Sequence, residues 1–270
     1  MDVTRSVAIA GLGAIGLPLA RALDQGAVPG LRLVAIAVRD AAKARAVLAG
    51  FATPPAIVDL AALAAADIVV EAAPAALFAA IATPALAAGR ILVPASVGAL
   101  LGRMELVELA RAHGGRIVVP TGALLGLDAV RAAAEDGVSR ITLETRKPPG
   151  GLEGAPYLLA NGISLAGLTE AKRVFVGNAR QAAEGFPANV NVGAALALAG
   201  IGAERTQVEI WADPAVARNT HTVRVEAEAA RFVMTIENVP SAENPRTGRI
   251  TALSVLACLR GLVAPLKVGT

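Results

Sequence analysis

The chain has 270 residues, of which 55% are hydrophobic and 3% aromatic, and its formal net charge is +3. This length allows one large domain or two modest ones. The basic residues are scattered singly, which argues against a nucleic-acid partner, whereas a small positive excess suits small anionic ligands. The apolar stretch from 60 to 89 is interrupted by two acidic residues and two prolines. We therefore expect no membrane-spanning helix.

The start of the chain and its single cysteine bear on the compartment. The first predicted strand begins by Ser6, which leaves no room for a signal peptide. One cysteine, Cys258, excludes an intramolecular disulfide and fits a reducing environment, so we expect a cytoplasmic protein. No group of histidine, cysteine and acidic residues has the spacing of metal ligands, and we predict no metal site.

A glycine-rich turn near the start organises the first half of the sequence. Residues 6–10 are an apolar run typical of a buried parallel strand, residues 17–23 are typical of a helix, and Gly11, Gly13 and Gly16 lie between them. The pattern G-x-G-x-x-G in this context predicts a dinucleotide-binding turn. Gly11 allows the tight turn, Gly13 lets a pyrophosphate approach the backbone, and Gly16 lets helix and strand pack closely. We expect NAD or NADP, bound by Gly11, Gly13, Ala14, Ile15 and Gly16.

The end of the second predicted strand, residues 31–38, bears on which cofactor is preferred. An acidic residue here commonly holds the adenosine ribose, but this strand is followed by Arg39 and then Asp40. Arg39 in that place would hold the 2′-phosphate of NADP, whereas an inward-facing Asp40 would favour NAD. A pair of solvated loop charges is the third possibility, so the sequence leaves the preference open.

Strands and helices alternate up to residue 120. After a helix at 41–50, we predict strands at 55–58, 67–73, 90–96 and 116–120, separated by helices at 60–66, 75–88 and 104–113. Alternation without hairpins predicts a parallel, doubly wound sheet. Ligands of such sheets lie at the carboxyl ends of the strands. This places Ala72, Ala73 and Ser96 with the glycine turn as cofactor-binding residues.

The pattern changes after Thr121. We predict helices at 126–133, 170–176, 179–185 and 192–199, a loop at 152–168, and strands at 140–147, 207–212, 222–227 and 231–237. The last three strands alternate in polarity and are separated by short polar turns, so they should form a mainly antiparallel sheet. A final helix should begin near Pro245, which suits a first turn, and run to about Leu262.

These patterns predict an α/β protein of two domains. Residues 1–121 form a dinucleotide-binding domain with a doubly wound parallel sheet. Residues 122–243 form a second α/β domain with a mainly antiparallel sheet, and the C-terminal helix, at about 244–270, packs back on the first domain.

Several segments resemble the signature segments of the L-aspartate dehydrogenase family. They lie at 122–129, 145–149, 186–192, 213–214, 219–221 and 244–247, and residues 96–100 match as well. One departure is Gly248, where many members carry serine. The resemblance covers essentially the whole chain in the right order, so it is far more specific than the glycine motif alone.

The resemblance implies a Rossmann domain, a substrate domain that mediates homodimer formation, and NAD(P)-dependent oxidative deamination of L-aspartate to oxaloacetate and ammonia through iminosuccinate. It implies that His221 is the catalytic histidine and that Ala123 and Asn191 contact the cofactor. Aspartate breakdown, aspartate synthesis and the supply of iminosuccinate to NAD biosynthesis all remain open as the physiological role.

The two histidines differ in their predicted surroundings. His113 lies at a helix C-terminus, where the helix dipole favours a cation and no function is needed. His221 follows a turn and precedes a strand, a placement common for site residues. A histidine with a pKa near neutrality can activate the water that adds to the imine and then return the proton to the departing ammonia.

Polar residues near two other element ends are candidate substrate-binding groups. Arg146 and Lys147 end a strand, where they would clamp a substrate carboxylate; a solvated charge pair is the alternative. Asn189 and Asn191 precede a predicted helix, which they can cap. Capping is compatible with Asn189 binding substrate and with Asn191 contacting the nicotinamide.

Two other functions fit the same pattern. A related NAD(P)-dependent dehydrogenase or imine reductase, of the homoserine dehydrogenase kind or acting on another small acidic amino acid, would share the architecture. A non-catalytic dinucleotide-binding sensor would bind the cofactor without turnover.

Overall fold

The computed structural model describes residues 4–187, 190–241 and 248–269. The chain divides into two compact units. The first comprises Met1–Pro120 with Thr251–Val268, and the second comprises Thr121–Ile250 with Gly269–Thr270. The C-terminal helix therefore belongs mostly with the N-terminal part of the chain. Among the described residues, no helix is both long enough and apolar enough to span a membrane.

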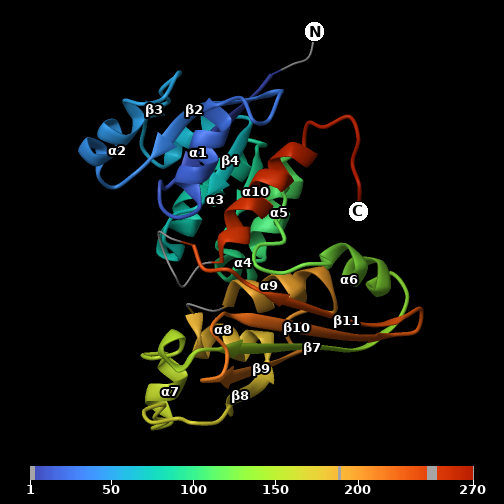
Figure 1. The fold of residues 1–270 in the computed structure, drawn as a ribbon. Helices are drawn as coiled ribbons and strands as arrows, with labels where there is room; N and C mark the ends of the chain where they lie inside the picture. The colour runs from blue at the N-terminus through green and yellow to red at the C-terminus, as the bar shows by residue number, and fades with distance from the viewer. Residues whose placement is uncertain (1–3, 188–189, 242–247, 270) are drawn as a thin grey trace. The chain divides into compact units, whose positions relative to one another are not determined.

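The first unit is built on a six-stranded parallel sheet (Figure 1). In the order β3-β2-β1-β4-β5-β6, its strands are β3 (Ala56–Ile57), β2 (Leu31–Ala37), β1 (Arg5–Ala10), β4 (Ile68–Glu71), β5 (Ile91–Pro94) and β6 (Arg116–Ile117). All neighbouring strands run parallel, which confirms the predicted sheet. The strand order reverses between β1 and β4, the position at which sheets of this kind bind ligands.

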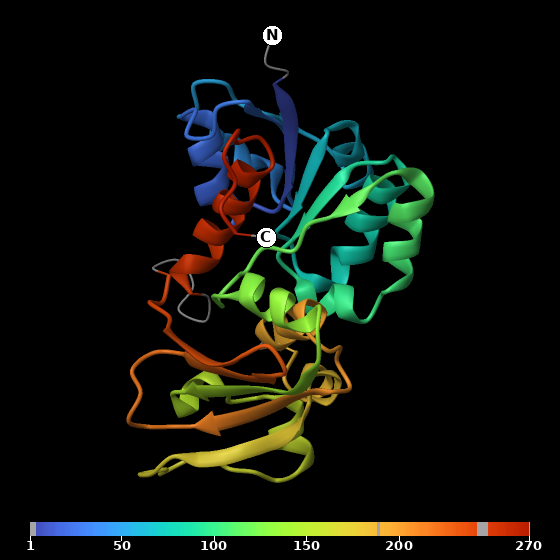
Figure 2. The same cartoon turned by 90° about the vertical axis from the view of Figure 1, so that its right-hand side faces the viewer.

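Helices cover both faces of this sheet (Figure 2). On one face lie α1 (Gly16–Asp24), α2 (Ala41–Leu48) and α10 (Arg249–Gly261). Leu19 and Leu48 from the first two helices and Val255 and Leu259 from α10 join the buried core around Ile9. The other face carries α3 (Phe78–Ala87) and α5 (Glu105–His113), which pack together. Three shorter helices complete the connections: η1 (Ala61–Ala65), η2 (Ala75–Leu77) and α4 (Val97–Leu101).

The second unit contains a five-stranded sheet. Its strands, in the order β11-β10-β7-β9-β8, are β11 (Arg231–Glu237), β10 (Thr220–Ala227), β7 (Val138–Lys147), β9 (Thr206–Ala212) and β8 (Lys172–Asn178). Strands β7 and β9 pair in parallel, and the other three pairs are antiparallel. This confirms the mainly antiparallel sheet, although β7 lies between β9 and β10, which are consecutive in the sequence.

One face of the second sheet is covered by helices α6 (Leu127–Ala134), α8 (Ala179–Gly185) and α9 (Val190–Ala199) (Figure 1). Because strand residues alternate between faces, Ile141, Leu143 and Val223 are buried beneath these helices. We call this the helix-covered face. The opposite face, which we call the open face, carries the alternate residues of the same strands, among them Arg140 and Arg224, both exposed.

Four local predictions in the second unit were wrong. The segment predicted as a helix at 170–176 is mostly β8, because Val174, Phe175 and Val176 favour a strand, and Phe175 and Val176 pair with β9. The loop predicted at 152–168 contains α7 (Pro156–Ala160), which is opened by a proline and follows η3 (Pro149–Gly151). His221 lies inside β10 rather than before it, and Asn191 lies inside α9 rather than before it. The predicted start of the C-terminal helix, at 244–245, lies outside the described residues.

Candidate active site

The glycine turn follows β1 in the first unit. Gly11 has a φ of +92°, and a Cβ there would lie 2.5 Å from the carbonyl oxygen of Ala72; a Cβ at Gly16 would overlap the carbonyl oxygen of Gly11. Packing of the protein itself therefore requires both of these glycines. A Cβ at Gly13, by contrast, would meet nothing within 4 Å. The open space beside Gly13 is what the approach of a pyrophosphate to the backbone needs.

The helix that follows the turn has an N-terminus that no side chain caps. Helix α1 begins at Gly16, its N-cap residue is Ile15, and the cap has no side-chain hydrogen bond. The first turn carries no acidic side chain. The amides at this end and the positive end of the helix dipole are therefore suited to a phosphate group. Ala14 and Ile15 lie in the connection between Gly13 and this helix. The residues of this turn fit a dinucleotide.

The two charged residues after β2 have different surroundings. The carboxylate of Asp40 accepts a hydrogen bond from the backbone N–H of Lys43 at 2.9 Å, so it caps α2. Arg39, one residue earlier, is exposed. The carboxylate thus has a role in the helix, whereas the guanidinium remains the side chain that would meet a 2′-phosphate. The cofactor preference stays a prediction.

A buried carboxylate holds the loops after β4 and β5 together, and sequence analysis did not single it out. Glu71, the last residue of β4, accepts hydrogen bonds from the Ser96 N–H and hydroxyl, both at 2.9 Å, and from the Ala73 N–H at 3.2 Å. Burial raises the pKa of Glu71, and these hydrogen bonds oppose that rise. Glu71 therefore fixes two of the three predicted cofactor-binding residues at this edge. An acidic residue ending an apolar strand was the available signal.

Three polar side chains meet on the helix-covered face of the second sheet. Thr145 and Lys147 are alternate residues of β7 and point to the same face, and His221 is the β10 residue directly opposite Thr145. The Thr145 hydroxyl lies 3.0 Å from Nδ1 of His221. Lys147 and His221 are only 6% and 4% exposed. We call these three residues the polar cluster.

Burial lowers the pKa of both nitrogen groups in the polar cluster. It lowers the pKa of Lys147 to about 8. It also lowers the pKa of His221 to about 3, and the positive charge of Lys147 contributes to that shift. The expectation that the pKa of His221 lies near neutrality is therefore wrong, and its imidazole is neutral at physiological pH. Of the two groups, Lys147 has the pKa that lies nearer to physiological pH.

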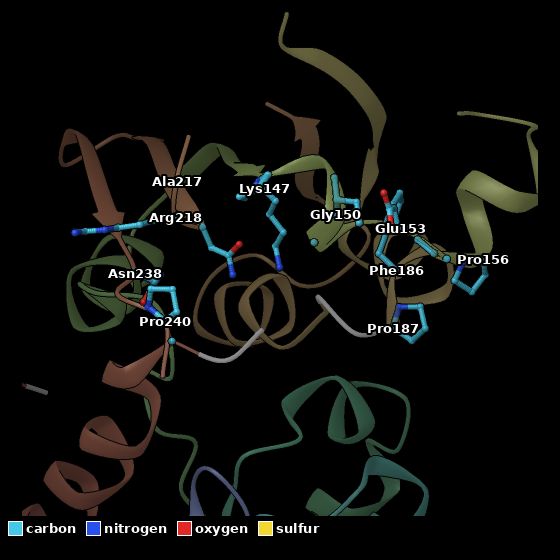
Figure 3. A pocket seen from close by; sticks show the side chains of 17 residues that line it. Lys147, Gly150, Glu153, Pro156, Phe186, Pro187, Ala217, Arg218, Asn238 and Pro240 are labelled. Carbon is cyan, nitrogen blue, oxygen red and sulfur yellow. The ribbon is translucent and has the colours of Figure 1, made fainter. Parts of the chain in front are cut away.

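A cavity of about 610 Å³ lies beside the polar cluster, within the size range of small-molecule sites. Its wall includes Lys147, Glu153, Phe186, Arg218 and Asn238, whereas Thr145 and His221 are not part of the wall. Figure 3 shows the Lys147 side chain extending into the cavity and that of Arg218 pointing away from it. Lys147 is therefore the member of the polar cluster that a ligand in this cavity would touch.

The structure separates the two predicted carboxylate-binding cations. Arg146 points to the open face, where its guanidinium contacts the carboxylates of Glu144 at 2.6 Å and Asp213 at 3.0 Å. It also lies 4.7 Å from the ring of Trp211. Arg146 and Lys147 are thus neither a joint clamp nor a solvated charge pair. The hydrogen bond that Arg146 donates to the Glu144 carboxylate is the main reason that the pKa of Arg146 is raised.

Asn238 connects the cavity wall to a residue that the family resemblance links with the cofactor. Its Nδ2 donates to the carbonyl oxygen of Ala123 at 3.1 Å, and its backbone N–H donates to Asn219. Its Oδ1 is buried and has no hydrogen-bond partner among the described residues, and a Cβ at Gly248 would lie 2.8 Å from that oxygen. Asn191 is exposed in the first turn of α9. Asn189, a predicted substrate-binding residue, lies outside the described residues.

In the described parts of the chain, no group of three or more histidine, cysteine, aspartate or glutamate residues is placed to hold a metal ion.

The parallel sheet with its glycine turn, joined in one chain to a second sheet with a polar cluster and a cavity, defines a nicotinamide-dependent dehydrogenase of two units. Residues 11–120 match the NAD-binding domain of homoserine dehydrogenase, and residues 128–262 match the C-terminal domain of aspartate dehydrogenase. The chain belongs to the aspartate dehydrogenase family.

Individual relatives agree with this assignment. An L-aspartate dehydrogenase of Bradyrhizobium diazoefficiens is 56% identical, over 98% of this chain and 94% of the relative. L-aspartate dehydrogenase 3 of Bordetella bronchiseptica is 53% identical, over 98% of this chain and 97% of the relative. The crystal structure of aspartate dehydrogenase from Thermotoga maritima matches with a TM-score of 0.73 at 25% identity, over 98% of this chain and 99% of that one.

Proposed function

We propose that this protein catalyses the NAD(P)-dependent oxidative deamination of L-aspartate to oxaloacetate and ammonia through iminosuccinate. Family membership supports the reaction. The observation that carries the proposal is the polar cluster of Thr145, Lys147 and His221, which presents one titratable side chain to a cavity of suitable size. Homoserine-dehydrogenase-like chemistry and a non-catalytic sensor are the alternatives that the experiment below addresses.

The first unit would hold the cofactor. When bound, the cofactor supplies the acceptor for a hydride. Gly11, Gly13 and the start of α1 would hold the pyrophosphate, because the turn is open at Gly13 and the helix end is uncapped. The other proposed cofactor-binding residues are Ala14, Ile15, Gly16, Arg39, Ala72, Ala73 and Ser96 in this unit, and Ala123 and Asn191 in the second.

The cavity of the second unit would take the amino-acid substrate. Lys147 is its buried cation, and it suits a dianionic substrate at neutral pH. We do not retain Arg146 as a substrate-binding residue, because two carboxylates on the open face hold it. Asn189 stays a prediction. His221 stays in the proposed site as a neutral imidazole whose ring is oriented by Thr145.

The open face of the second sheet would form a homodimer interface in a cytoplasmic protein. Val176 on β8 and Val233 on β11 are 60% and 63% exposed. Ion pairs between Arg224 and Glu144, and between Arg173 and Glu209, cross the strands on this face. A surface with apolar positions and both signs of charge can pair with a second copy of itself. Light scattering should give twice 27.1 kDa; a monomer would contradict this.

The proposed reaction is tested with the purified protein, NAD or NADP, and a panel that includes L-aspartate, L-glutamate, L-homoserine and L-malate. We expect reduction of the cofactor with L-aspartate and equal amounts of oxaloacetate and ammonium. Turnover with a different member of the panel would favour the related dehydrogenase. Cofactor binding without any turnover would favour the sensor.

A further inference from the structure

The cavity of the second unit holds the primary amine of Lys147, and the proposed reaction ends with a ketone. We propose that Lys147 also forms an imine with oxaloacetate and releases carbon dioxide from it, so that the protein has a second activity as a decarboxylase of a β-keto acid. This inference rests on the proposed function for its choice of substrate, because oxaloacetate is the product of that reaction. It leaves the role of His221 in the dehydrogenation unchanged.

Lys147 differs in its surroundings from the other lysines of the chain. The sequence contains four lysines, all within the described residues, and Lys43, Lys172 and Lys267 are exposed. Lys147 is 6% exposed, and its side chain extends into the cavity (Figure 3). It is also the one lysine of the four in the cavity wall. A small carbonyl compound in the cavity would therefore meet this amine and no other lysine of its own chain.

The cavity wall around this amine is largely apolar. Leu152 and Phe186 are each 1% exposed, and the ring of Phe186 packs edge-on against that of Phe175, with their centroids 5.5 Å apart. Four prolines form much of the remaining wall: Pro148, Pro156, Pro187 and Pro240. Loss of carbon dioxide converts a carboxylate into a neutral molecule. Apolar surroundings favour such a step, because they stabilise a buried charge poorly.

Imine formation requires the unprotonated amine, and burial supplies it. Burial lowers the pKa of Lys147 from the usual 10.5 to about 8, so a useful fraction is unprotonated near neutral pH. His221 faces Lys147 from β10 and is neutral at physiological pH. Glu153 and Arg218 reach the cavity wall from two loops, but both are exposed, so solvent screens their opposite charges. The Asp213 carboxylate is held by an arginine on the open face.

The reaction can be written without an oxidant or a reductant. Nζ of Lys147 adds to the C2 carbonyl carbon of oxaloacetate, and loss of water gives a protonated imine, which keeps the positive charge of the lysine. The bond between C3 and the C4 carboxylate then breaks, its electron pair moves toward the imine to form an enamine, and carbon dioxide leaves. C3 takes a proton from water, and hydrolysis releases pyruvate and restores the amine. The net change converts oxaloacetate and one proton into pyruvate and carbon dioxide.

Reductive trapping tests whether the imine forms. The purified protein is incubated with oxaloacetate and sodium cyanoborohydride, without cofactor, at about pH 8, the lowered pKa of Lys147. Peptide mass spectrometry then locates the modified residue. We expect a reduced adduct on Lys147 and much less on Lys43, Lys172 and Lys267. No adduct on Lys147, or the same degree of modification on all four lysines, would overturn the inference.

Lys147→Arg tests whether the imine leads to loss of carbon dioxide. Arginine keeps the positive charge, but its guanidinium is not deprotonated in proteins and cannot form the imine. The wild type should release pyruvate from oxaloacetate faster than buffer alone does, and Lys147→Arg should fall to that background rate. Lys172→Arg, the matched change at an exposed lysine of the same sheet, should keep the wild-type rate. Pyruvate release by Lys147→Arg at the wild-type rate would contradict the inference.

A competition experiment on the wild type stays valid if arginine disturbs the fold. Succinate is a dicarboxylate of the same length that has no ketone, so it can occupy the cavity but cannot form an imine. Saturating succinate should suppress trapping on Lys147 and leave trapping on the exposed lysines unchanged. Trapping on Lys147 that succinate does not reduce would place the reaction outside the cavity and overturn the inference.

The inference and the proposed function can fail separately. A protein that does not oxidise L-aspartate with either cofactor would refute the proposed function, whereas the trapping and pyruvate assays use oxaloacetate itself and no cofactor. A protein that oxidises L-aspartate but gives neither the adduct on Lys147 nor pyruvate above background would overturn this inference alone.

Discussion

The two units build their candidate sites from different parts of the chain. The first uses main-chain groups: a turn whose glycines exclude side chains and the uncapped start of α1, supported by the carboxylate of Glu71. The second uses side chains, since Lys147 and His221 come from strands more than seventy residues apart in the sequence and meet only through the pairing of β7 with β10. A main-chain site can be predicted from the local spacing of residues in the sequence. A side-chain site depends on the register in which distant strands pair.

The strongest test of the main-chain site compares two of its glycines. Gly13→Val should fold normally, because a Cβ there meets nothing within 4 Å, but should weaken cofactor binding by about a hundredfold, roughly 2.7 kcal/mol. Calorimetric titration with NADH and NADPH measures this change.

Gly16→Ala is the matched variant, because its Cβ would overlap the Gly11 carbonyl oxygen inside the protein. It should lower the melting temperature, which Gly13→Val should leave near that of the wild type. Unchanged cofactor affinity in Gly13→Val would remove this turn from the site.

Substitution of the buried carboxylate of Glu71 should lower cofactor affinity less than Gly13→Val does. Glu71→Gln offers one acceptor oxygen where Glu71 has two, so the contacts to Ser96 and Ala73 cannot all be kept. We expect cofactor affinity to fall by about tenfold, roughly 1.4 kcal/mol, with little change in the KM for L-aspartate.

The same substitution has a predicted effect on the pH dependence of stability. Because the folded-state pKa of Glu71 is raised, the folded protein binds this proton more tightly than the unfolded chain does. The free energy of unfolding should therefore fall as pH rises above about 4.5 towards the folded pKa. Urea unfolding at several pH values should show a weaker fall of this kind in Glu71→Gln; an identical slope would contradict the account.

Cofactor preference in the first site is predicted to rest on the side chain of Arg39. Arg39→Ala should weaken NADPH binding about tenfold while NADH binding changes less than twofold, if the exposed guanidinium meets the 2′-phosphate. Asp40→Ala is the control, because its loss removes the α2 cap and should cost about 1 kcal/mol of stability. Equal weakening of both cofactors in Arg39→Ala would defeat the assignment.

The smallest effect is expected where sequence analysis placed a substrate contact. Arg146→Gln removes two partly exposed ion pairs on the open face, so the KM for L-aspartate should change less than twofold and stability by about 1 kcal/mol or less. A large rise in KM, with unchanged dimerisation by light scattering, would return Arg146 to the substrate site.

The sequence was sufficient to predict most of the first unit and part of the second. The parallel sheet and the glycine turn followed from strand–helix alternation and from spacing, because both are local patterns. β8 was taken for a helix because its Val-Phe-Val run is too short to show a period on its own, and its pairing with β9 decides its state. The acid–base role predicted for His221 took its pKa to lie near neutrality, and the sequence alone could not show that the residue is only 4% exposed.

The roles of Arg146 and Lys147 could not be separated in the sequence without the register of β7. Adjacent strand residues point to opposite faces, but which face is covered depends on α6, α8 and α9. Asn238 and Glu71 were missed for a related reason: their importance lies in the loops that they hold, Ala123 in one case and Ser96 in the other.

The pH dependence of kcat/KM for L-aspartate in the wild-type enzyme tests most directly whether the buried Lys147 binds the substrate in the side-chain site. As a cation Lys147 suits the dianionic substrate, so kcat/KM should fall as pH rises through the lowered pKa of Lys147, at about 8. A limb at the ordinary histidine pKa of about 6.5, or no limb between pH 6.5 and 9, would contradict the account.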